Sequence, residues 1–103
     1  MSARQMATLT REALEESAHR LFPNLTLDQV LANLLLERAQ RNLIKYRVMA
    51  RQFEVKYGQP FEAFRQHVLT SEAAFQVEQD YFDWELAMTG IGDMDAEIQR
   101  LRP

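Results

Sequence analysis

The sequence predicts an all-α protein: a long antiparallel helical hairpin resembling a coiled coil, with a short N-terminal helix and a short connecting helix. Two observations support this fold class. The stretch from Thr26 to Gly58 has a helix start signal, a helix stop signal and an unbroken apolar seam between them. The stretch 71–103 has a seam with the same three- and four-residue spacings and a similar length. Two such helices can bury their seams against each other.

We treat residues 1–103 as a single helical domain, since a chain of 103 residues has the size of one domain or less. Its predicted parts are an N-terminal segment and helix (1–25), a long central helix (26–58), a connector helix (59–70) and an acidic C-terminal helix (71–103).

The sequence contains signals for both ends of the central helix. Thr26 and Gln29 fit a capping box, Gly58 fits a left-handed C-cap, and Pro60 prevents continuation. At about 1.5 Å per residue this helix is roughly 45 Å long, so it needs another helix along it. Its seam recurs at spacings of three and four: Ala32, Leu36, Ala39, Leu43, Tyr46, Ala50, Phe53 and Tyr57.

The N-terminal part predicts a helix that Thr10 caps and that ends before Pro23. Its expected buried stripe is Leu14, Ala18, Leu21 and Phe22. With the preceding segment 4–9, this helix has the outline of a ribbon-helix-helix DNA-binding domain. A ribbon needs basic or amide side chains to reach base edges, and the segment offers only Arg4 and Gln5. We therefore favour a plain helical hairpin here and keep DNA binding as an alternative.

In the C-terminal half, Pro60 begins the connector helix, and Thr70 or Ser71 is expected to cap a last helix from Glu72. Gly90 and Gly92 are expected to loosen or break this helix. Its seam is Ala74, Val77, Tyr81, Trp84, Met88 and Ile91, resuming out of step as Met94, Ile98 and Leu101. Tyr81 and Trp84 are expected to fill the room left by the alanines of the central seam.

The last helix also carries a second apolar stripe, nearly opposite its seam. Acidic residues surround this stripe, which gives it the aromatic centre and polar rim of a protein-binding surface. We call this predicted partner-binding surface the acidic aromatic face: Glu72, Phe75, Glu78, Phe82, Asp83, Glu85 and Leu86. The stripe could instead pack on the N-terminal helix or on a second copy of the chain. The central helix has its own second stripe, which could serve a homodimer: Val30, Leu34, Ile44, Val48 and Val55.

Charge is strongly polarised along the chain, although the net charge is only -3. Residues 27–67 carry seven basic and four acidic side chains, whereas 68–103 carry two basic and eight acidic ones. One explanation is that the acidic last helix neutralises the basic central helix. The other is an acidic surface left over for a basic partner, such as a nucleic-acid-handling protein.

No group of residues indicates catalysis, a metal or a cofactor. Glu16 and His19 have the spacing of one half of a di-iron site, but no second pair exists. The segment 93–97 lacks the turn glycine of a calcium loop. The chain has no cysteine, and no apolar run approaches the eighteen or so residues of a membrane span. We expect a soluble, cytoplasmic, non-enzymatic protein without a cofactor.

The segments KYGQPFEAF and EQDYFDWE, within 46–85, resemble short all-helical prokaryotic proteins of toxin-antitoxin gene pairs, as the antitoxin-like member. The resemblance implies a non-enzymatic protein that binds and silences a toxin, and it assigns no residue a role. Our expectation is therefore a protein-binding module that covers a basic partner such as a nuclease-type toxin. From its small size we also expect a homodimer. The alternatives are a ribbon-helix-helix repressor, with nucleic-acid binding the less favoured, or a structural coiled-coil adaptor.

Overall fold

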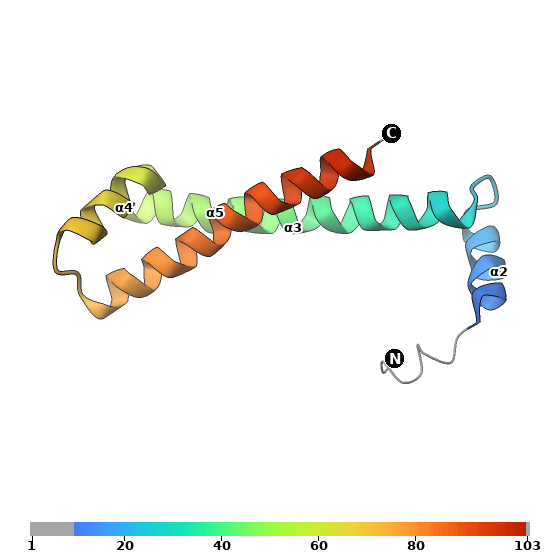
Figure 1. Cartoon of the computed structure of the whole chain (residues 1–103), viewed down its shortest axis with the longest axis horizontal. Coiled ribbons are helices and arrows are strands. Elements are labelled where there is room, and N and C mark those ends of the chain that lie inside the picture. The colour runs from blue at the N-terminus through green and yellow to red at the C-terminus, as the bar shows by residue number, and fades with distance from the viewer. Residues whose placement is uncertain (1–9, 103) are drawn as a thin grey trace.

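The computed structural model describes residues 10–102, and this part of the chain contains four helices and no strand. The helices are α2 (Arg11–Leu21), α3 (Leu27–Tyr57), α4 (Phe61–Thr70) and α5 (Phe75–Leu101). α3 and α5 run antiparallel and cross obliquely, α4 joins them at one end, and α2 projects sideways at the other (Figure 1). The molecule is elongated, with extents of 59 × 32 × 18 Å. The predicted all-α hairpin is confirmed.

The start and stop signals of the first two helices act as predicted. Thr10 Oγ1 accepts a hydrogen bond from the Ala13 amide at 3.1 Å. The capping box of α3 is complete: the Gln29 amide donates to Thr26 Oγ1 at 3.2 Å, and the Thr26 amide donates to Gln29 Oε1 at 2.8 Å. Gly58 adopts the left-handed conformation, with φ 64° and ψ 25°, and ends α3. These ends follow from contacts within one helical turn.

The expected start of the last helix at Glu72 is wrong. α5 begins at Phe75, and the residue before it, Ala74, offers no capping side chain. The hydroxyl groups expected to cap α5 instead serve the end of α4. Thr70 Oγ1 donates to the Gln66 carbonyl at 2.7 Å, and Ser71 Oγ donates to the His67 carbonyl at 2.6 Å. They satisfy carbonyl groups that the end of a helix leaves without partners.

The expected break at Gly90 and Gly92 is also wrong, because α5 is continuous from Phe75 to Leu101. Gly90 is buried against α3, where its lack of a side chain admits the ring of Tyr46. The seam adjusts at a neighbouring position: Ala87 is completely buried, whereas Met88, which we placed in the seam, is 41% exposed. The helix therefore accommodates the out-of-step spacing by changing which residue faces α3. Nothing in the structure explains Gly92.

The core consists of two clusters along the α3 and α5 contact. One cluster is centred on Ala39, Leu43 and Ile98. The other is centred on Trp84, which is 1% exposed, with Phe64 and Tyr81. Four aromatic rings lie 5.1–6.2 Å from the Trp84 ring, centroid to centroid: Phe53, Tyr57, Phe61 and Phe64. The expectation that Tyr81 and Trp84 fill the room left by the alanines is confirmed at Ala50, which packs against their cluster. It is wrong at Ala39, which packs against Ile98 in the other cluster.

The stripe assigned to the N-terminal helix is not buried. α2 contains no buried residue, and Leu14 and Leu21 are 47% and 75% exposed. α2 lies only against the start of α3 (Figure 1), where Val30 is buried, so Val30 does not belong to the exposed second stripe of α3. The ribbon that we considered, together with its Arg4 and Gln5, falls outside the described residues.

Candidate functional site: an acidic aromatic face on α5

The acidic aromatic face is exposed, as its position opposite the seam predicts. Phe75, Phe82 and Leu86 are 80%, 59% and 60% exposed, so the stripe packs neither on α2 nor on α3. The centroid of the Phe82 ring lies 5.5 Å from that of the Tyr81 ring, at an interplanar angle of 29°, and this contact steadies Phe82 on the helix surface. Exposed apolar side chains gathered in one stripe mark a binding site more often than isolated exposed residues do.

The acids predicted for the rim occupy both sides of the stripe. At about 100° per residue, Glu78 and Glu85 fall on one flank of the stripe and Asp83 on the other. Glu85 Oε2 accepts a hydrogen bond from the Tyr81 hydroxyl at 2.9 Å, and Asp83 Oδ1 accepts one from Gln79 Nε2 at 3.2 Å. Glu72 lies apart from the helical rim, in the segment before α5, and it is exposed.

None of these four acids has a cation partner within residues 10–102. Only two ion pairs join α3 to α5, Lys56 to Asp80 at 2.6 Å and Arg47 to Asp95 at 3.9 Å. The other six ion pairs among residues 10–102 join residues three or four apart in the same helix. Neutralisation of the central helix by the last one is therefore partial, and four of the acids without a cation partner in residues 10–102 belong to the acidic aromatic face.

A second exposed stripe lies on the outer side of α3, and we call it the basic aliphatic face. Its apolar residues Ile44, Val48 and Val55 are 62%, 51% and 68% exposed. Lys45, Arg47 and Arg51 flank them, and residues 38–51 contain five cations and no acid. The two outer surfaces of the hairpin therefore carry opposite charge.

Sequence reasoning missed one polar cluster, which clips α5 to the end of α3. Asp80 is buried, and its Oδ2 accepts hydrogen bonds from Lys56 Nζ at 2.6 Å and from the Tyr57 hydroxyl at 2.5 Å. Gln76 Nε2 donates to Oδ1 at 3.0 Å. The signal in the sequence is an aspartate placed next to Tyr81, within an otherwise apolar seam. Pairing it with residues 23 and 24 positions away needs the tertiary structure.

The cluster shifts the pKa values of its three titratable members, through hydrogen bonding at Asp80 and Lys56 and through burial at Tyr57. The hydrogen bonds from Lys56 and Tyr57 lower the pKa of Asp80. The hydrogen bond to Asp80 raises the pKa of Lys56. Burial, and then the bond to Asp80, raise the pKa of Tyr57. The arrangement is a structural clip, because the buried carboxylate of Asp80 accepts all three of these hydrogen bonds and so ties α5 to the end of α3.

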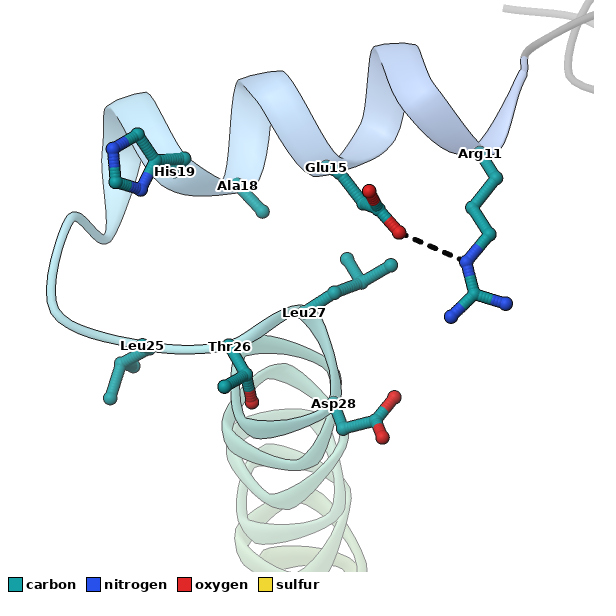
Figure 2. Close-up of a pocket in the computed structure, with 8 residues that line it drawn as sticks. All are labelled: Arg11, Glu15, Ala18, His19, Leu25, Thr26, Leu27 and Asp28. Atoms are coloured by element: carbon teal, nitrogen blue, oxygen red, sulfur yellow. Dashed lines mark hydrogen bonds and ion pairs between the residues drawn. The ribbon is translucent and has the colours of Figure 1, made fainter.

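The hollow between α2 and the start of α3 offers no comparable chemistry. Figure 2 shows Arg11 turned toward Glu15, its ion-pair partner at 3.0 Å, while His19 lies at the far end of the hollow. Glu16, which precedes His19 by three residues, pairs with Arg20 at 3.5 Å. In the described part of the chain, no three His, Cys, Asp or Glu side chains converge in a way that could hold a metal ion. No helix between residues 10 and 102 combines the length and the apolar character that a membrane span requires.

No family model, no curated protein sequence and no solved structure matches the chain.

Proposed function

We propose that this chain is a non-enzymatic protein-binding module, antitoxin-like, whose acidic aromatic face covers a basic surface on another protein. One observation supports this proposal above all. An exposed stripe of Phe75, Phe82 and Leu86 is flanked by carboxylates that have no cation partner among the described residues. A stable fold does not require such a surface, and exposing it has a cost in solubility.

The mechanism is occlusion. Aromatic side chains at the centre of an interface supply most of the binding free energy, and a rim that excludes water strengthens them. The carboxylates on the rim steer encounter with a positively charged surface and raise the association rate. A nuclease-type toxin presents such a basic surface, because it must contact phosphate groups. Covering that surface would silence the toxin without any chemical step or cofactor.

The proposal places the chain in the cytoplasm, where a toxin acts on nucleic acid, and the absence of cysteine suits a reducing compartment. The clip at Asp80 contributes indirectly. It holds the first half of α5 against the end of α3, so that Phe82 and its flanking acids are presented on a rigid helix.

The test is a growth rescue. A small gene adjacent to this one is expressed alone, where we expect growth arrest, and then together with this chain, where we expect growth to recover. Phe82→Ala and Glu78→Lys should lose rescue, because truncation of a central aromatic residue weakens binding about 30-fold or more. Rescue that survives both substitutions, or failure of the unaltered chain to rescue, would contradict the proposal.

Two matched controls separate loss of the face from general damage. Leu69→Ala removes an apolar side chain from α4 that is 58% exposed, close to the value for Phe82, and should still rescue. Glu12→Lys reverses an acid in the first turn of α2, as Glu78→Lys does in the first turn of α5, and should also rescue. Thermal melts of all four variants show that each one is folded.

A further inference from the structure

The two outer faces of the hairpin match each other in spacing. Along α5, Phe82 follows Phe75 by seven residues, and Leu86 follows Phe82 by four. Along α3, taken from its C-terminal end, Val48 lies seven residues before Val55, and Ile44 lies four residues before Val48. Two such helices packed antiparallel would therefore bring the three apolar residues of each face opposite those of the other in a single register. The facing pairs are Phe75 with Val55, Phe82 with Val48, and Leu86 with Ile44.

The same register matches the charges on both flanks. On α3, Arg47 and Arg51 fall on one side of the apolar stripe and Lys45 on the other, at about 100° per residue. When two helices pack antiparallel, corresponding flanks meet. Each acid then comes within about two residues, or about 3 Å along the axis, of a cation. The resulting neighbours are Glu78 with Arg51, Glu85 with Arg47, and Asp83 with Lys45.

We infer that the acidic aromatic face of one copy packs antiparallel onto the basic aliphatic face of a second copy. Both faces are exposed within the hairpin, and Lys45 has no ionic partner in the described part of the chain. α3 and α5 are antiparallel within one copy, and the proposed contact makes α5 of one copy antiparallel to α3 of the next. Helix directions therefore alternate along the whole assembly. The contact joins two different surfaces, so it leaves one face free at each end, and further copies can add head to tail.

This inference proposes head-to-tail association in place of the expected homodimer, and it stands independently of the proposed function. It does have a consequence for that function. A basic partner protein would compete with the second copy for Phe82 and its surrounding acids, so partner binding would break the assembly apart.

The test uses two blocking variants of the full chain. Val48→Asp places a charge in the centre of the basic aliphatic face, and Phe82→Asp does the same in the acidic aromatic face. We expect the mass of the unaltered chain to rise with concentration in analytical ultracentrifugation, and each variant alone to remain at the 12.1 kDa monomer mass. Each variant keeps the face that the other has lost. Their equimolar mixture should therefore form a complex of twice the monomer mass and nothing larger.

Three outcomes would overturn the inference: an unaltered chain that stays monomeric, an unaltered chain whose mass levels off at a dimer, or a mixture that does not associate. Leu21→Asp is the control, because Leu21 is 75% exposed on α2 and lies on neither face. Loss of association in this control would assign the contact to α2 instead. Val48→Asp leaves the acidic aromatic face intact and should still rescue growth, so the two proposals can fail separately.

A charge exchange tests the register itself. Asp83→Lys alone should weaken association, because it sets a lysine against Lys45 of the next copy. The double variant Asp83→Lys with Lys45→Asp should restore association, since every contact then contains the reversed pair. The register also sets Asp93 opposite Glu37, so Asp93→Asn should strengthen association. A double variant no better than Asp83→Lys would contradict the antiparallel register.

Discussion

Gly90 of α5 lies directly against the ring of Tyr46 of α3. A Cβ atom at position 90 would stand 2.6 Å from Tyr46 Cδ2 and 2.7 Å from Cγ, closer than packed carbon atoms come. The glycine therefore lets the two helices approach at the point where their two core clusters meet. A residue that weakens a helix by its intrinsic propensity is here required by the packing.

Gly90→Ala and Gly92→Ala should consequently have opposite effects. Alanine at position 92 has no atom within 4 Å of its Cβ, so it should raise stability by up to about 1 kcal/mol through helix propensity. Alanine at position 90 gains the same propensity but overpacks the contact, at a cost of about 1–3 kcal/mol. Thermal melts should show Gly90→Ala clearly below Gly92→Ala. Equal melting temperatures would mean that the Tyr46 ring moves aside without cost.

Truncation of Trp84 and of Phe82, two residues apart, should lower folding stability by very different amounts. Trp84 is 1% exposed among four aromatic rings, so Trp84→Ala should cost about 3–5 kcal/mol of folding stability. Phe82 is 59% exposed, so Phe82→Ala should cost less than about 1 kcal/mol. Chemical denaturation of the two variants measures both values, at a concentration low enough to exclude self-association. A Phe82 variant as unstable as the Trp84 variant would show that the stripe belongs to the core.

The Asp80 clip should make stability depend on pH in the acid range. The hydrogen bonds from Lys56 and Tyr57 lower the pKa of Asp80 in the folded state. Its contribution is therefore fully present above the ordinary aspartate value of 3.8, and it is lost as the pH falls through the lowered folded-state pKa.

Asp80→Asn removes this charge and provides the comparison. At neutral pH the variant should be less stable by about 1–3 kcal/mol, because buried and charge-assisted hydrogen bonds are lost. The gap should narrow as the pH is lowered below 3.8, where the aspartate itself becomes protonated. Denaturant titrations at several pH values measure the gap, and a constant gap would rule out the clip as its origin.

The chain alone should show no specific binding to its own upstream DNA at physiological salt. The reason is the small number of basic side chains before Arg11, where a ribbon would have to contact bases and phosphates. A gel-shift titration with a scrambled duplex as control measures this. A sequence-dependent complex with a nanomolar midpoint would support the ribbon-helix-helix alternative instead.

The features that the sequence predicted correctly depend on residues close together in the chain. The capping box at Thr26 and the left-handed Gly58 each act within a turn of the helix they begin or end. The exposed position of Phe82 opposite Trp84 follows from helical periodicity, which needs no knowledge of the partner helix. Periodicity therefore located both the seam of the hairpin and the candidate binding face.

The features that only the tertiary structure decided depend on residues far apart in the chain. The sequence alone predicts Gly90 to be a helix breaker, and only the contact with Tyr46 shows that the packing requires it. Likewise, only the tertiary structure shows that Asp80 is bound by Lys56 and Tyr57 and is not a surface acid. The wrong prediction that the stripe of α2 is buried has a similar origin. Periodicity shows which side of a helix is apolar, but it does not show whether another element packs against that side. Local hydrogen bonding and periodicity set where a helix runs and how its sides differ, whereas the packing of α3 on α5 determines which of those sides is covered.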